Sequence, residues 1–113
     1  MKLITAIVQP DKLDEVMRAV SGAGARGLTA CEVRGFGQQY GHMGAEARPA
    51  DQSVLVLPKL RVDVVVQEES TEPVIRAIAE SVKSGAIGDG KIWVTEVESV
   101  MRVRTGERDH HAI

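Results

Sequence analysis

The sequence predicts an α+β fold in which two similar halves follow one another along 113 residues. Each half contains an apolar, β-branched run, then a segment with apolar residues at helical spacing, then a second β-branched run. A long segment between the halves is rich in glycine and charged residues and follows neither pattern. The predicted order is therefore β-α-β followed by β-α-β.

The first half begins with a predicted strand at residues 2–9, KLITAIVQ. Pro10 is suited to the first turn of a helix, because that turn does not use its N–H. Apolar residues at i, i+3, i+4 and i+7 then form one stripe: Leu13, Val16, Met17 and Val20. We expect Gly22 and Gly24 to end this helix, and residues 27–35 to form the second strand.

The second half repeats this order without repeating the residues. Its first strand is predicted at residues 60–67, LRVDVVVQ, and Ser70 or Thr71 can cap the helix that follows. The apolar stripe of that helix is Val74, Ile78 and Val82. Residues 91–97 are predicted as the fourth strand, and residues 99–104 as a last short extended piece.

This order is typical of the ferredoxin-like arrangement, with two helices on one face of a four-stranded antiparallel sheet. The other face of the sheet would then have no helix of its own. We expect small or apolar residues there, such as Ile4 or Ile7, Ala30 and Val65. A face of this kind favours association of several copies. Cys31, in the second strand, is expected to be a small core residue.

Composition indicates a single domain over residues 1–113, with 43% apolar residues and a net charge of −2. That charge argues against binding to nucleic acid or to a membrane surface. A single cysteine leaves no disulfide within the chain, which suits a reducing compartment. The apolar stretch at the N-terminus is too short for a signal peptide or a membrane span, so we expect a soluble cytoplasmic protein.

Residues 36–58 separate two strands that should be neighbours in the sheet. A hairpin connection needs two to five residues, and structureless loops beyond roughly 12–15 residues are usually functional or disordered. This segment is either a tolerated surface insertion or a mobile arm that binds a partner, and its length favours the arm.

Catalytic signatures are absent from the sequence: it contains no H-E-x-x-H, C-x-x-C or G-x-S-x-G motif. We therefore predict that the protein is not an enzyme. His42 lies in the long loop, and His110 and His111 are adjacent in a polar tail, where histidines are usually solvated rather than bound to metal.

Anion binding is better supported. Residues 84–91, SGAIGDGK, combine three glycines with Lys91, and such turns can present backbone N–H groups to a phosphate. The alternative is a tight connection between a helix and a strand. Arg102 and Arg104 lie two residues apart, so an extended backbone would place both on one face. They could bind phosphates, or pair with nearby acids: Glu96, Glu98 or Glu107.

Four stretches together resemble the PII nitrogen-regulatory signal proteins: residues 1–16, 27–42, 83–94 and 100–113. IGDGKI and RVRTGE, in this order and separation, are the most specific. The resemblance implies a homotrimer whose clefts between subunits bind ATP or ADP, with AMP also possible. It further implies 2-oxoglutarate bound through Mg²⁺, and a sensor rather than a catalyst. Residues 36–58 would be the T-loop, which docks on transporters, enzymes or regulators.

The resemblance also implies roles for individual residues. Lys91 would reach the phosphates, and Arg102 and Arg104 would reach them from the adjacent subunit, within a C-terminal loop and tail at residues 101–113. The full nucleotide-binding set is Thr29, Gly35, Phe36, Gly37, Gln38, Asp63, Val65, Ser84, Gly88, Asp89, Gly90, Lys91, Arg102 and Arg104. Gln39 would contact Mg²⁺ and 2-oxoglutarate, and Lys59 would pair with the distal carboxylate of the oxoacid.

Three positions depart from the family pattern. Gln38 stands where an arginine is usual, and Ala86 where a lysine is usual. The loss of these cations is expected to weaken the preference for ATP over ADP or AMP. Tyr40 lies at the base of the T-loop and no tyrosine lies near its tip, so we predict no tyrosine nucleotidylylation.

Two other functions stay open at this point. One is a PII-like regulator of bicarbonate or metal transport that responds to another small ligand. The other is a metal-binding trimer of the CutA type, which would use His42, His110 or His111.

Overall fold

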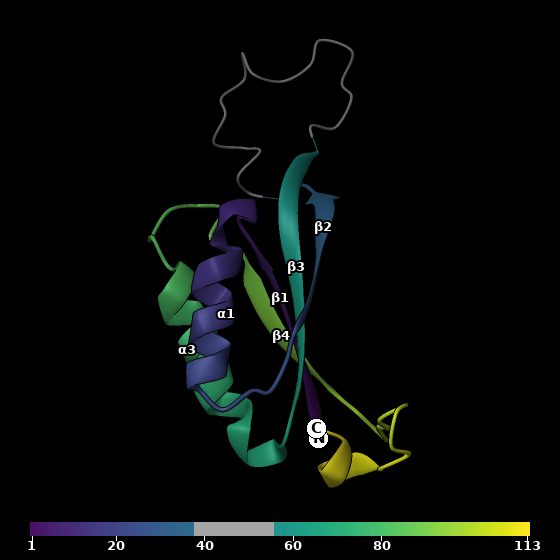
Figure 1. Ribbon diagram of the computed structural model, residues 1–113. Coiled ribbons are helices and arrows are strands. Elements are labelled where there is room, and N and C mark those ends of the chain that lie inside the picture. The colour runs from purple at the N-terminus through teal and green to yellow at the C-terminus, as the bar shows by residue number, and fades with distance from the viewer. Residues whose placement is uncertain (38–55) are drawn as a thin grey trace, which may run out of the picture.

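A four-stranded antiparallel sheet with two helices against one face forms the body of the protein (Figure 1). The computed structural model describes residues 1–37 and 56–113. In chain order the main elements are β1 (Lys2–Val8), α1 (Leu13–Gly22), β2 (Thr29–Gly35), β3 (Leu57–Val66), α3 (Thr71–Val82) and β4 (Lys91–Glu96). The strand order β2-β3-β1-β4 confirms the predicted ferredoxin-like fold.

The core lies between the helices and the sheet, and the predicted helical stripes form one side of it. Val16 and Val20 of α1 are buried, as are Val74, Ile78 and Val82 of α3. The sheet contributes every second residue of its two central strands: Ile4, Ala6, Val8, Leu60, Val62, Val64 and Val66. The core is therefore almost wholly aliphatic, as the low aromatic content requires.

The end of α1 shows why glycine is needed there. Gly24 has a φ of 99°, a left-handed conformation that favours glycine. The Ala25 N–H donates to the Val20 carbonyl at 2.9 Å, and the Gly24 N–H to the Ser21 carbonyl at 3.2 Å. This pair of bonds is a Schellman motif, which satisfies carbonyls that the helix leaves unpaired.

The side-chain cap predicted for the start of α3 does not form. Ser70 occupies the N-cap position, but its side chain makes no capping hydrogen bond. The Thr71 hydroxyl instead donates backward to the Gln67 carbonyl at 3.4 Å. A short 3-10 turn, Glu68–Ser70, precedes the helix and supplies its first turn in place of a side-chain cap.

Two residues predicted on the helix-free face of the sheet belong to the other face. Ile4 is fully buried beneath the helices, and Ala30 pairs with the core residue Val62 and packs against the same core. Ile7 and Val65 lie on the helix-free face, because they alternate with core residues along their strands. The residues expected on the helix-free face are therefore right for Ile7 and Val65 and wrong for Ile4 and Ala30.

The prediction that Cys31 is a core residue is also wrong. Cys31 is exposed, and it pairs in register with Arg61 on the helix-free face. The neighbouring Ala30 occupies the core side instead, since successive side chains of a strand point to opposite faces.

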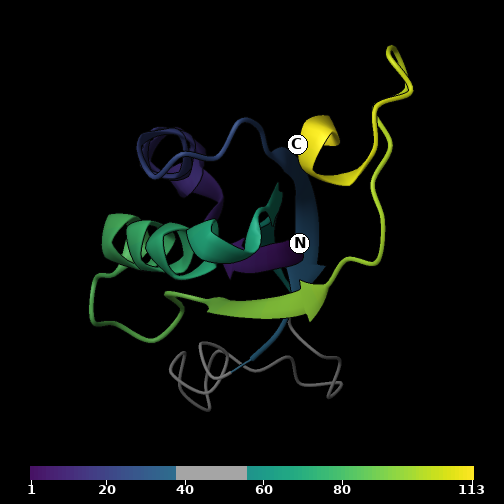
Figure 2. The same ribbon diagram turned by 90° about the horizontal axis from the view of Figure 1, so that it is seen from below.

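Residues 99–104 do not form the extended piece that was predicted. Met101 makes an isolated bridge with Arg108, and the chain between them folds into a tight turn. The Gly106 N–H donates to the Arg102 carbonyl at 2.8 Å and closes this turn. A short 3-10 helix, Asp109–Ala112, follows and lies near the end of the sheet where β1 begins (Figures 1 and 2).

The segment predicted as the T-loop is shorter than expected at its C-terminal end, because β3 already begins at Leu57. Gln38, Gln39, Tyr40 and His42 lie outside the described residues. No helix among residues 1–37 and 56–113 is long and apolar enough to cross a membrane.

Candidate functional site

The predicted binding residues fall into two groups at opposite ends of the sheet (Figure 1). The glycine-rich loop precedes β4, at the end of the sheet where β2 ends and β3 begins. The turn that contains Arg102 and Arg104 lies at the other end, beyond the end of β4. A single chain therefore does not bring Lys91 together with these arginines.

The glycine-rich loop is organised by Asp89 from within. Its carboxylate accepts hydrogen bonds from the backbone N–H groups of Ser84 and Gly85, each at 2.9 Å. It also accepts one from the Ser84 hydroxyl at 2.5 Å. These bonds, the one from the Ser84 side chain foremost, hold the pKa of Asp89 below its ordinary value. Asp89 thus shapes the loop as a carboxylate.

Gly90 lets the loop approach the sheet closely. Its φ is 106°, and a Cβ atom built there would lie 1.8 Å from the Ile7 carbonyl oxygen. No other residue fits without moving backbone. The next residue, Lys91, pairs in register with Ile7, which itself pairs with Arg61 of β3. The loop is therefore tied to the helix-free face of the sheet at its last residue.

A groove with a volume of about 930 Å³ lies at the opposite end of the sheet. Four residues of the predicted nucleotide-binding set line it: Thr29, Asp63, Val65 and Arg102. The resemblance implies that the first three surround the adenine base. His110 and His111 of the C-terminal helix line the groove as well. The structure thus brings these three residues together.

Both carboxylate oxygens of Asp63, in this groove, accept hydrogen bonds. Its carboxylate accepts from the Thr5 hydroxyl at 2.7 Å and from the Arg61 guanidinium at 3.0 Å. Partial burial acts to raise the pKa of Asp63, but the hydrogen bonds and charge of Arg61 and the bond from Thr5 outweigh it and lower that pKa. Asp63 therefore stays ionised and can accept further hydrogen bonds.

The two arginines of the C-terminal turn do not share one face as predicted. Arg102 pairs with Glu107 at 2.9 Å and lines the groove. Arg104 lies within the turn itself and does not line the groove. The backbone turns at residues 103–105, so the alternating side-chain directions of an extended chain do not apply there. Arg102 instead forms the surface ion pair with Glu107 that was the alternative.

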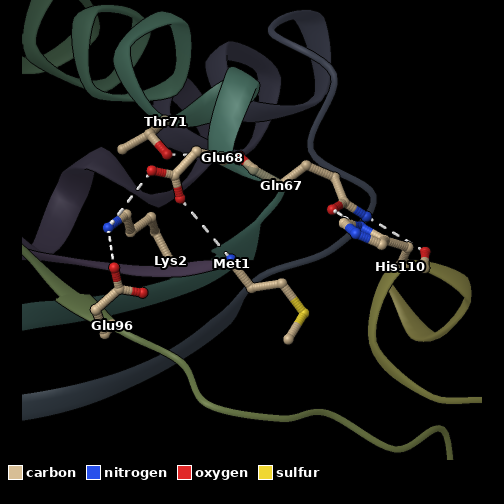
Figure 3. Close-up of polar contacts among 7 residues, drawn as sticks. All are labelled: Met1, Lys2, Gln67, Glu68, Thr71, Glu96 and His110. Atoms are coloured by element: carbon tan, nitrogen blue, oxygen red, sulfur yellow. Dashed lines mark hydrogen bonds and ion pairs between the residues drawn. The ribbon is translucent and has the colours of Figure 1, made fainter.

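Contacts that sequence patterns did not indicate anchor the C-terminal segment (Figure 3). The Gln67 side chain lies 2.6 Å from Nδ1 of His110 and donates to the His110 carbonyl at 3.3 Å. Beside this pair, Lys2 bridges Glu68 and Glu96, and its hydrogen bond with Glu96 raises the pKa of Lys2. A polar residue just past a strand, as Gln67 is, gives no signal of its partner before the fold is known.

The remaining predicted residues lie at the end of β2, on β3, or outside the described residues. Gly35 ends β2, and Phe36 after it is 68% exposed. Lys59 of β3 contacts the Gln9 side chain at 3.4 Å. Across the described ranges, no three His, Cys, Asp or Glu side chains gather where they could bind a metal ion.

The sequence matches a known protein family. The family model described as "Nitrogen regulatory protein P-II" matches residues 1–107. The chain belongs to the P-II family. It is 46% identical to the nitrogen regulatory protein GlnK of Escherichia coli strain K12, and 50% identical to the nitrogen regulatory protein P-II of Rhizobium leguminosarum bv. viciae. The P-II protein of Pasteurella multocida is 48% identical. Each match covers 100% of both chains.

Membership of the P-II family confirms the resemblance of the four sequence stretches. This P-II family member is a signal-transduction regulator with a ferredoxin-like fold.

Proposed function

We propose that this P-II family member senses adenine nucleotides in clefts between the subunits of a homotrimer. The observation that supports this most directly is the division of the site within one chain. The base-binding groove and Arg102 lie at one end of the sheet, and the glycine-rich loop with Lys91 lies at the other. A nucleotide would contact both only where one subunit's groove end meets another's loop end.

Each part suits a different portion of the nucleotide. Val65 offers an apolar surface to the base, and the Asp63 carboxylate offers an acceptor for an exocyclic amine or a ribose hydroxyl. Gly88 and Gly90 would leave backbone N–H groups accessible to phosphate oxygens, and Lys91 would add a point charge. Ser84 and Asp89 would maintain the shape of that loop.

Arg102 would have to exchange Glu107 for a phosphate. The pair is partly exposed, and exposed ion pairs contribute little to stability, so the exchange costs little. A guanidinium binds phosphate through two parallel hydrogen bonds, which favours the exchange. Arg104, which lies in the turn, would swing toward the same phosphates.

A second ligand, 2-oxoglutarate, would bind next to the phosphates. Mg²⁺ prefers hard oxygen ligands, which the phosphates and the Gln39 side chain would supply. Lys59 would pair with the distal carboxylate of the oxoacid. Its contact with Gln9 supports this, since Gln9 also contacts the glycine-rich loop and so places Lys59 beside the phosphate end of the site.

The output of this sensor would be a protein contact rather than a reaction. Residues 36–58 would dock on a nitrogen-metabolism enzyme or a membrane transporter, and would do so differently in each ligand state. The protein would then act in the cytoplasm and would be recruited to the membrane when its target is a transporter. GlnK of Escherichia coli is named as a nitrogen regulatory protein, which supports the nitrogen branch of this proposal.

Calorimetric titration with ATP, ADP and AMP tests the proposal, each with and without Mg²⁺ plus 2-oxoglutarate or bicarbonate. We expect binding of at least ATP or ADP, abolished by Lys91→Ala and by Arg102→Ala. Lys83→Ala is the matched control, because Lys83 lies at the end of α3 outside the predicted set. Absence of heat with every nucleotide would refute nucleotide sensing, and a response to bicarbonate alone would favour the transport regulator.

A further inference from the structure

The side chain of Gln9 joins two parts of the candidate site that belong to different elements. Its amide nitrogen donates to the Gly88 carbonyl of the glycine-rich loop at 2.8 Å. Its amide oxygen accepts from the Lys59 ammonium group of β3 at 3.4 Å. The planar amide of Gln9 thus connects β3 to the glycine-rich loop.

The backbone fixes Gln9 in this place. Val8 pairs with Leu60, so the next step of the ladder sets Gln9 opposite Lys59. Pro10 follows and restricts Gln9 to extended conformations, which agrees with its φ of −65° and ψ of 144°. The direction of the side chain is therefore determined by the end of β1 and not by the loop.

The loop reaches Gln9 because of Gly90. Only a residue without a side chain can lie so close to the Ile7 carbonyl, and Gly88 lies two residues before it. Ile7 and Gln9 point to the same side of the extended chain. The close approach at Gly90 therefore brings the Gly88 carbonyl within hydrogen-bond distance of the Gln9 amide.

We propose that Gln9 is a positioning residue that holds the Lys59 ammonium group and the glycine-rich loop in one fixed arrangement. The inference rests on the proposed function, in which Lys59 and the loop bind two different anions. An anion that binds Lys59 competes for the same ammonium group that contacts the Gln9 oxygen. Release of that contact would alter the bond to Gly88, so occupation of one anion site would change the other.

Substitutions at Gln9 separate the two contacts. Gln9→Glu keeps an acceptor for Lys59 but has no donor for the Gly88 carbonyl. Gln9→Lys keeps a donor for Gly88 but places a second positive charge beside Lys59. Gln9→Leu removes both contacts at similar volume. Gln67→Leu is the matched control, because it makes the same change at the opposite end of the sheet.

Amide hydrogen exchange of residues 84–90, without any ligand, gives the first measurement. We expect exchange about five- to tenfold faster in Gln9→Leu and Gln9→Glu, the factor for one lost hydrogen bond. We expect rates near those of the unaltered protein in Gln9→Lys and Gln67→Leu. Equal rates in Gln9→Leu and the unaltered protein, or fast exchange in Gln67→Leu as well, would overturn the proposal.

Coupling between ligands gives the second measurement, which a merely structural role would not change. The dissociation constant of ATP with Mg²⁺ is measured with and without 2-oxoglutarate, and the ratio gives the coupling factor. We expect that factor to fall several-fold toward 1 in Gln9→Leu. An unchanged factor overturns the coupling. If the unaltered protein binds no nucleotide, the proposed function fails, while the exchange rates still decide the role of Gln9.

Discussion

At the residue scale, Asp89 stabilises the conformation of the glycine-rich loop through hydrogen bonds within the loop. The family resemblance groups it with the phosphate-binding residues, yet its carboxylate is occupied by Ser84 and Gly85. A carboxylate facing a phosphate would repel it, whereas one that fixes the backbone behind the phosphate would not. The spacing of the loop residues could not distinguish these two roles.

Asp89→Asn tests this role through pH. The folded protein lowers the pKa of Asp89 below 3.8, so the charged form stabilises the fold above pH 3.8. That contribution is lost as the pH falls through the folded pKa. We expect urea unfolding to show the unaltered protein more stable than Asp89→Asn at neutral pH, with the difference shrinking below pH 3.8. A difference that is constant with pH would contradict the role of the charge.

Gly90 provides the strongest steric prediction. Gly90→Ala would set a methyl group against the Ile7 carbonyl and strain a φ of 106°, so we expect a loss of about 3 kcal/mol or more. Gly85→Ala is the control, since its φ of 85° is also left-handed but nothing lies within 4 Å. It should cost about 1–2 kcal/mol. Urea unfolding measures both, and equal losses would show that the close approach at Ile7 is not rigid.

At the scale of whole elements, the alternation of apolar residues predicted the strands and helices well. Val62, Val64 and Val66 share the buried face of β3, and α3 buries the expected stripe. Alternation does not show which face the helices cover. That depends on pairing register, and the register of Ala30 with Val62 exists only in the folded sheet. Ala30 was placed on the wrong face for this reason.

The prediction of an extended piece at residues 99–104 is wrong for a related reason. Residues 99–104 have the composition of a strand, but within residues 1–37 and 56–113 they pair with no strand of the sheet, and a turn closed by Gly106 forms instead. Arg102 and Glu107 meet across that turn. The residues that the resemblance assigns to nucleotide binding include four that line the groove, and their role stays a prediction. Gln9 and Gln67 were not indicated by the sequence, because their partners are distant along the chain.

The contacts between Gln67 and His110 are expected to hold the C-terminal 3-10 helix in place. Gln67→Leu removes both contacts to His110, and we expect faster hydrogen exchange at residues 108–113 by about fivefold. Gln9→Leu is the control and should leave this segment unchanged.

At the scale of the whole molecule, the separation of Lys91 from Arg102 and Arg104 predicts complementation between subunits. Chains with Lys91→Ala would lose the loop charge, and chains with Arg102→Ala and Arg104→Ala would lose the charges of the turn. Each protein alone should bind no ATP. In mixed trimers, however, some clefts would join the intact loop of one chain to the intact turn of the other.

In a closed ring of three subunits that contains both chains, about one cleft in three has this intact combination. We therefore expect co-expressed, doubly tagged trimers to bind ATP at about a third of the sites of the unaltered protein, measured by calorimetry. The two variants purified separately and mixed without exchange serve as the control and should bind none. If co-expressed chains also bind none, both halves of each site come from one subunit, and the arrangement between subunits is wrong.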